Sequence, residues 1–338
     1  PSPVAIDAPC TMANAPAMSP HEHDEVALAA RLIQLHSPTG AESPATTALV
    51  EAMQELGYDE AGLDEAGNAV GTFRRGDGPS IVLNGHLDTV PLGDETQWPH
   101  PPLSGAIADD RLWGRGACDM KSAVACQTLA ARDAVDAGFR GTLTVAAVVQ
   151  EEDGGFGARV FARGRRADVV LLGEPSKLQL KLGHRGRLEL HVRFEGRIAH
   201  AARSSLGQNA LYPTARFLSA LEQLELPRGG PLEGSSATPT QLVSHPRKGP
   251  NVVPGAAELI VDYRNIPEDS PGQVQARIAA LLGPDGSVRV PTRTVKSEDG
   301  AVQEQCSRVV LPYQVPTDSP LVPRAQQILA PILASHGM

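Results

Sequence analysis

The chain has 338 residues, of which 41% are hydrophobic and 20% charged, and its formal net charge at pH 7 is -9. This composition is typical of a soluble globular protein, long enough for one large or two medium domains. The negative charge argues against nucleic acid or an anionic membrane as the main partner. No apolar run approaches the roughly 20 residues that cross a bilayer, so we expect no membrane span.

The start of the chain is rich in Pro, Ala and Ser and lacks the basic start and continuous apolar core of a secretory signal. We therefore expect residues 1–20 to form a mobile tail. The four cysteines form no CxxC pair and are too few for a disulfide scaffold: Cys10, Cys118, Cys126 and Cys306. This usage predicts a cytoplasmic location, with Cys118 and Cys126 as ordinary buried thiols.

Helices and strands alternate over the first half of the chain. Three segments with apolar residues at helical spacing are predicted helices: 24–37, 45–58 and 120–138. Three short runs rich in Val, Ile, Leu and Ala are predicted strands: 81–84, 143–150 and 168–173. Apolar strands that alternate with helices indicate an α/β layer with a mixed, largely parallel sheet.

The pattern changes near Leu180. Residues 188–194 alternate apolar and polar side chains, as in a half-exposed antiparallel strand. A helix, two strands, a helix and a strand follow: 209–224, 240–245, 257–264, 271–283 and 287–290. The order β-α-β-β-α-β predicts a ferredoxin-like α+β domain. We place it at 179–293, where it interrupts a larger domain formed by 21–178 and 294–338.

Possible metal ligands follow each predicted strand of the larger domain. They are His86 and Asp88, then Glu151 and Glu152, then Glu174. In open α/β sheets, ligands bind at the carboxyl ends of the strands, so parallel neighbours would bring these side chains together. Asp119, directly before the helix predicted at 120–138, would join them.

Each of these residues also has an ordinary structural explanation. His86 alone fits a hydrogen-bonded core histidine, Asp119 a helix N-cap, and the glutamates polar turns. Together, however, close carboxylates repel by roughly 4 kcal/mol per pair at about 4 Å and an effective dielectric of about 20. Protonation or bound cations relieve this repulsion, and the histidine favours cations. Three carboxylates and a water nearly neutralise two divalent ions, which leaves a fourth carboxylate to act as a base.

Four motifs, in this order, resemble those of the M20 dizinc amidohydrolases and peptidases: GHLDTVP, GRGACDMKSAVA, VQEEDGG and LLGEPS. The match covers about residues 24–325, and the inserted domain resembles the lid and dimerisation domain of that family. The resemblance implies a homodimer that pairs through this domain. It also implies two divalent metal ions, in the first place zinc, with cobalt or manganese as alternatives.

The resemblance assigns the metal ligands residue by residue. It implies that Asp119 bridges the two ions, that His86 and Glu174 complete the ligands of one, and that Glu152 binds the other. The peptide bond after Asp119 is expected to be cis. The last ligand of the family, a histidine in a Gly-rich segment, has no counterpart before Met338. We therefore expect either a longer protein or a poorly bound second ion.

The resemblance also assigns catalytic and substrate-binding roles. Asp88 would orient the imidazole ligand from behind, and Glu151 would be the general base that takes a proton from the water at the ions. His200 would reach the partner subunit's site and stabilise the oxyanion. Asn251 and Arg264 resemble the family's binders of the substrate carboxylate, although Arg264 at a strand end also fits a surface ion pair.

The expected function is metal-dependent hydrolysis of the amide bond of an N-acyl amino acid. Glu174, where an aspartate is the alternative, resembles the deacetylase and desuccinylase branch of the family. An M20 carboxypeptidase or dipeptidase acting on short peptides is the close alternative. A non-catalytic metal- or carboxylate-binding relative without the second metal site is the other, and the intact Glu151 speaks against it. A last helix is predicted before Gly337, and His336 lies at its end. A charged imidazole there would interact favourably with the helix dipole, so we do not assign His336 as a metal ligand.

Overall fold

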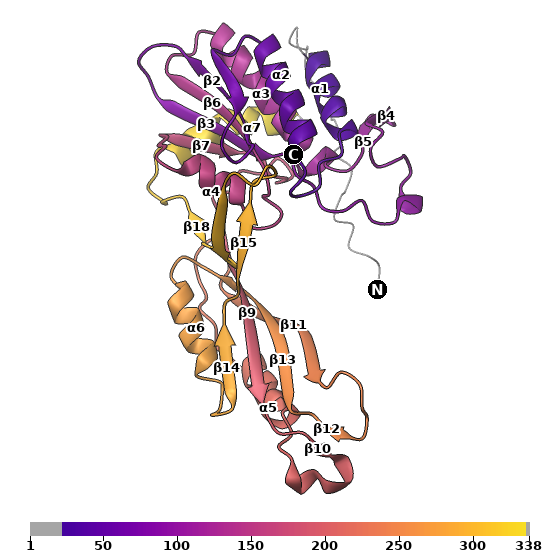
Figure 1. The fold of residues 1–338 in the computed structure, drawn as a ribbon. Helices are drawn as coiled ribbons and strands as arrows, with labels where there is room; N and C mark the ends of the chain where they lie inside the picture. The colour runs from indigo at the N-terminus through magenta and orange to yellow at the C-terminus, as the bar shows by residue number, and fades with distance from the viewer. Residues whose placement is uncertain (1–21, 336–338) are drawn as a thin grey trace. The chain divides into compact units, whose positions relative to one another are not determined.

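The structure is a computed structural model that describes residues 22–335, with side chains from 24 to 334. The tail predicted at 1–20, and His336 and Gly337, lie outside the described residues. The chain divides into two compact units (Figure 1). Unit 1 holds the described residues up to Leu180, Val295–Glu304 and those from Ala325 onward; unit 2 holds Lys181–Thr294 and Gln305–Arg324.

Unit 1 is built on a five-stranded mixed sheet in the order β1-β2-β6-β3-β7. Its strands are β1 Glu60–Leu63, β2 Ala69–Arg74, β3 Ser80–His86, β6 Thr142–Val148 and β7 Val169–Leu172. As predicted, β6, β3 and β7 are parallel neighbours. The other two strands were not predicted, and both pair antiparallel. The fold of unit 1 is therefore mixed α/β.

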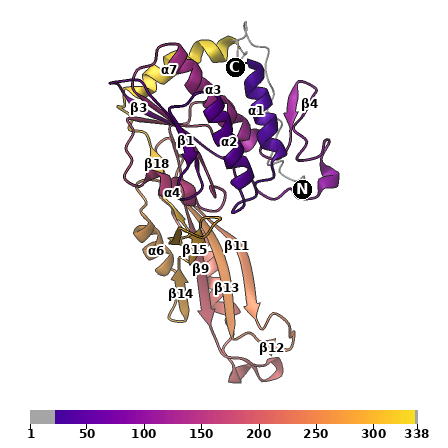
Figure 2. The same cartoon turned by 45° about the horizontal axis from the view of Figure 1, so that its top comes forward.

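Helices cover both faces of this sheet (Figures 1 and 2). They are α1 Glu22–Gln34, α2 Ser43–Glu55, α3 Ser122–Asp136 and α4 Phe156–Ala162, and the chain's last helix is α7 Leu321–Ser335. Leu32 of α1, Leu49 of α2 and Val124 of α3 are fully buried in one core with Val145 of β6. Phe161 of α4 packs on the opposite face of the sheet. No helix among the described residues is both long enough and apolar enough to cross a membrane.

Unit 2 contains an antiparallel sheet in the order β11-β13-β9-β14. Its elements are β9 Gly186–Glu195, α5 Leu211–Glu222, β11 Ser236–His245, β13 Ala256–Asn265, α6 Pro271–Ala279 and β14 Gly286–Arg289. The alternation predicted for 188–194 is present, because Leu188, Leu190, Val192 and Phe194 are buried. They form the core of unit 2 with Phe217 of α5 and Ile278 of α6.

The boundary after residue 293 differs from the predicted one. Sequence pattern assigns everything from 294 to the larger domain, whereas residues 305–324 belong to unit 2. The cause is backbone pairing of β17 Val309–Val310 with β9, and of β18 Tyr313–Gln314 with β8 Gly183–His184. Strands of two residues are too short to produce a periodic sequence signal.

The remaining strands are short. They are β4 Ala106–Ala108, β5 Arg111–Trp113, β10 Ala199–His200, β12 Val252–Val253, β15 Thr292–Lys296 and β16 Gln303–Ser307. One side-chain prediction is wrong: Cys126 is exposed, and Cys118 is partly buried. Cys126 lies on α3, whose neighbouring residues Val124 and Ala125 face the core instead.

Candidate active site

His86 ends β3 with its side chain almost completely buried. The preceding Gly85 allows this strand to approach α3, because an added Cβ would lie 2.6 Å from Met120 Cε and 2.8 Å from Val124 Cγ2. The His86 Nδ1 atom lies 2.9 Å from the backbone oxygen of Asp88. A proton on Nδ1 donated to this carbonyl leaves Nε2 free as a metal ligand.

Two carboxylates face the Nε2 atom of His86. Asp119 Oδ1 lies 3.0 Å from it and Glu174 Oε1 lies 3.8 Å from it. Their ligand atoms and that of His86 all lie within 4.8 Å of one another, although they come from three separate segments. One imidazole and two carboxylates form a donor set that suits zinc-like ions, so these residues fit a metal site.

Lys121 attaches the segment that carries Asp119 to the end of α1. The expected cis peptide between Asp119 and Met120 is present. Lys121 is buried, and its Nζ donates to the carbonyls of Leu32 and Leu35, each at 2.8 Å. Leu32 lies in the last turn of α1 and Leu35 directly after the helix, where carbonyls attract cations. Burial lowers the pKa of Lys121 to about 8.

Asp88 connects the histidine to the loop that carries the glutamates. Its fully buried carboxylate accepts the amide of Glu151 at Oδ1 (2.9 Å) and the amide of Glu152 at Oδ2 (3.1 Å). Oδ2 also accepts from Thr39 Oγ1 at 2.9 Å. Burial opposes the charge, but the hydrogen bond with His86 and these donors lower the pKa of Asp88 overall. Asp88 is thus a charged acceptor shared by two parts of the site.

The charges of the site favour a bound cation. Desolvation, assisted by Asp119 and partly offset by His86, raises the pKa of Glu174 to about 7. Desolvation likewise raises the pKa values of Glu151 and Glu152, and nearby carboxylates add to the effect. Although burial opposes it, hydrogen bonding to Asp119 and to Asp88 raises the pKa of His86 to about 11. A divalent ion would relieve this crowding of carboxylates.

Comparison with known proteins identifies the family. The model of "Peptidase family M20/M25/M40" matches residues 82–332. The chain belongs to this family. A succinyl-diaminopimelate desuccinylase from Alkalilimnicola ehrlichii is 33% identical over 285 residues, which cover 77% of this chain and 74% of the relative. Membership makes the chain a metal-dependent hydrolase that acts on amide bonds.

Solved structures show the same fold. An M20 family metallo-carboxypeptidase from Sulfolobus solfataricus has a TM-score of 0.69 at 15% identity, over 91% of this chain and 84% of that chain. A dinuclear metal-binding peptidase of the M20 family from Bacillus subtilis has a TM-score of 0.60 at 14% identity, over 92% of this chain and 80% of that chain. These likenesses confirm the mixed α/β fold of the M20 hydrolase.

Glu152, the ligand predicted for a second ion, does not join the group of three. Among the described residues, His86, Asp119 and Glu174 form a group of possible ligands without it. Its position is nevertheless fixed through its backbone amide, which donates to Asp88. Among the described residues, the M20 hydrolase therefore presents one three-ligand group, with the backbones of Glu151 and Glu152 both held by Asp88.

The predicted residues of unit 2 separate into two places. His200 on β10 and Asn251 lie together, since the Ala201 amide donates to the Asn251 backbone oxygen at 2.8 Å and β10 pairs with β12. Arg264 lies near the end of β13, where its Nε donates to Asp262 Oδ1 at 2.6 Å. The ion pair matches the alternative considered for this arginine.

The two places lie at opposite ends of β13. This strand starts at Ala256, shortly after β12, and Arg264 is its ninth residue. Eight steps of extended chain at about 3.3 Å each span about 26 Å. One copy of unit 2 therefore keeps Arg264 far from His200.

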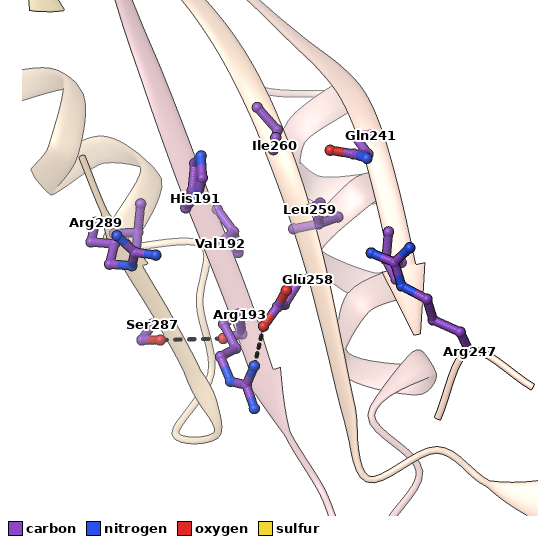
Figure 3. A pocket seen from close by; sticks show the side chains of 12 residues that line it. His191, Val192, Arg193, Gln241, Arg247, Glu258, Leu259, Ile260, Ser287 and Arg289 are labelled. Carbon is purple, nitrogen blue, oxygen red and sulfur yellow. Dashed lines mark hydrogen bonds and ion pairs between the residues drawn. The ribbon is translucent and has the colours of Figure 1, made fainter. Parts of the chain in front are cut away.

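A hollow of about 300 Å³ on the sheet of unit 2 contains none of the predicted site residues (Figure 3). Polar side chains from β9, β13 and β14 line it, among them His191, Arg193, Glu258 and Arg289. Arg193 and Glu258, two of these lining residues, form an ion pair with each other.

Three residues that support the site were not identified from sequence: Thr39, Glu42 and Asn68. Thr39 and Glu42 lie in the polar turn between α1 and α2, where such residues resemble helix caps. Asn68 lies in the turn between β1 and β2, where asparagine is common. Polar residues beside a turn are the only sequence signal, and it does not show that their side chains point inward.

Proposed function

We propose that this M20 hydrolase cleaves the amide bond of an N-acyl amino acid, with Glu151 as the general base. The observation that carries the proposal is the group of ligand atoms from His86, Asp119 and Glu174 within 4.8 Å of one another. Glu151 is held beside them by Asp88, the residue that also contacts His86. The name of the relative from Alkalilimnicola ehrlichii makes N-succinyl amino acids the first substrates to test.

His86, Asp119 and Glu174 would hold one divalent ion, and Glu152 would contribute to a second. A bound ion supplies Lewis-acid polarisation of the amide and lowers the pKa of water. We propose zinc as the native metal, with cobalt or manganese as alternatives. The description of the Bacillus subtilis relative as dinuclear supports a count of two.

Glu151 supplies the proton transfers that amide hydrolysis needs. Its carboxylate takes a proton from the attacking water and delivers it to the nitrogen as the C–N bond breaks. The products are the acyl carboxylate and the free amino group. The hydrogen bond from the Glu151 amide to Asp88 fixes the backbone from which this carboxylate projects.

We further propose that unit 2 is the ferredoxin-like lid and dimerisation domain, extended by residues 305–324. Arg264 and Asn251 would bind the substrate carboxylate, and His200 would stabilise the oxyanion in the partner subunit's site. The separation of about 26 Å along β13 supports a site shared between two subunits, because His200 and Asn251 lie at one end of the strand and Arg264 at the other. The edge strand β11 exposes half of Leu242 and offers a surface for pairing two copies.

A substrate panel tests the proposed function. The protein, loaded with zinc, is assayed on N-succinyl and N-acetyl amino acids and on dipeptides, before and after treatment with a chelator. We expect hydrolysis of an N-acyl amino acid that is lost on chelation and restored by metal. Turnover of peptides alone would favour the carboxypeptidase or dipeptidase alternative. Light scattering tests the dimer, and cell fractionation tests the predicted cytoplasmic location.

A further inference from the structure

The backbone amides of residues 149–152, which include the proposed base, each donate a hydrogen bond to a side-chain oxygen of a buried residue. The bonds run from Val149 to Asn68 Oδ1 (2.9 Å), from Gln150 to Glu42 Oε1 (3.0 Å), from Glu151 to Asp88 Oδ1 (2.9 Å) and from Glu152 to Asp88 Oδ2 (3.1 Å). Asp88 has a role from the family resemblance, whereas Glu42 and Asn68 have none.

Glu42 is 1% exposed although it carries a carboxylate. It directly precedes α2, yet its side chain makes no capping hydrogen bond to that helix. Its Oε1 instead accepts from the Gly40 amide at 2.8 Å and from the Gln150 amide. Burying a charged group is costly without such partners, so both donors help to retain Glu42 in this place.

Gln150 is the residue at which the chain turns out of β6 toward the glutamates. Its φ of 54° is in the left-handed region, which is unfavourable for a residue with a side chain. Glu42 holds its amide, and its own Nε2 donates to the Lys296 carbonyl at 2.8 Å. The unfavourable turn is thus held from both its backbone and its side chain.

Asn68 holds both ends of the same loop. Its Oδ1 accepts the Val149 amide, and its Nδ2 donates to the Gly157 carbonyl at 2.9 Å and to Asp64 Oδ2 at 2.8 Å. A Cβ at Gly157 would lie 2.2 Å from Asn68 Oδ1, so only glycine permits this approach. Asn68 is fully buried and therefore fixes the distance between the start and the end of the loop.

We propose that Glu42 and Asn68 are positioning residues for amide hydrolysis, acting through the backbone of residues 149–152 to aim Glu151 and Glu152. The proposal rests on the proposed function. Displacement of a base or a ligand by such a change typically costs about 10- to 100-fold in activity or metal affinity. The loss should fall on kcat with little change in KM, because neither side chain is among the proposed substrate-binding residues.

Variants at Glu42 separate positioning from general stability. Glu42→Ala removes the acceptor, Glu42→Asp shortens it, and Glu42→Gln retains Oε1. Thr128→Ala is the matched control, since Thr128 is fully buried and its hydroxyl donates only to Val124, within α3. We expect kcat to fall about 10- to 100-fold in Glu42→Ala and Glu42→Asp, and to stay within about threefold in Glu42→Gln and the control.

Amide hydrogen exchange of the metal-free protein gives a readout that does not depend on activity. We expect exchange at Gln150 to accelerate at least about tenfold in Glu42→Asp, and exchange at Val149 in Asn68→Ala, with α3 unchanged. Unaltered exchange, or a Glu42→Gln enzyme as slow as Glu42→Asp, would overturn the proposal. If the wild-type protein hydrolysed no N-acyl amino acid, the proposed function would fail while the exchange experiment would still test the positioning.

Discussion

The carboxylate of Asp88 lies 3.5 Å from Nδ1 of His86, and both side chains are almost completely shielded from solvent. The same carboxylate accepts the amides of Glu151 and Glu152. One charged group therefore sets both the ring of a proposed metal ligand and the backbone of the proposed base. Geometry at the two positions is coupled through Asp88.

Asp88→Asn should weaken metal binding and slow hydrolysis together. The substitution removes the negative charge and replaces one acceptor oxygen with a donor, so one of the two loop amides loses its partner. We expect a loss of about 10- to 100-fold in metal affinity and in kcat. Titration with Co²⁺, followed by visible absorption, measures the first effect. Asp94→Asn is the control, because Asp94 caps an exposed turn at Glu95–Gln97; equal losses in both variants would refute the coupling.

Glu42 should make the metal-free protein less stable as the pH rises from about 4.5 to about 7. Burial, with a contribution from Asp88, raises the pKa of Glu42 to about 7 from an ordinary 4.5. Between these values the unfolded state binds fewer protons than the folded state, so stability falls with pH and the cost is complete above pH 7. The shift corresponds to about 3 kcal/mol.

Glu42→Gln removes this titration and retains the acceptor oxygen. Urea unfolding at pH 5 and pH 7.5, in the presence of a chelator, should show the variant gaining about 2–3 kcal/mol on the wild type at the higher pH. Glu51→Gln is the control, because Glu51 lies in an exposed ion pair with Arg31. A difference between variant and wild type that does not change with pH would contradict the expectation.

Lys121→Met should destabilise unit 1. The change removes the hydrogen bonds that Lys121 donates to the carbonyls of Leu32 and Leu35, a loss that costs about 1–3 kcal/mol. Chemical denaturation measures the loss, and Lys248→Met, at an exposed position, should behave like the wild type. A stable Lys121→Met protein would show that the end of α1 does not need this contact.

The metal-binding end of the sheet could be predicted because its three parallel strands are runs of Val, Ile, Leu and Ala, although β7 itself is largely exposed. Apolar runs identified β3, β6 and β7; His86 is the last residue of β3, and Glu174 lies two residues after β7. In contrast, β1 (EAGL) and β2 (AVGTFR) give weak signals because glycine and charged residues interrupt their apolar residues. Glu42 and Asn68 could not be predicted, since each reaches an amide more than 80 positions away in the chain.

Hydrolysis of an N-acyl amino acid by Glu151→Gln, with metal content measured on the same sample, tests the central claim most directly. Glu151 is proposed as the base and is not among the proposed metal ligands. We expect kcat to fall about 10²- to 10⁴-fold while the bound metal is unchanged, and the neighbouring Asp153→Asn to remain active. A Glu151→Gln enzyme that retains wild-type kcat with its metal in place would contradict the account.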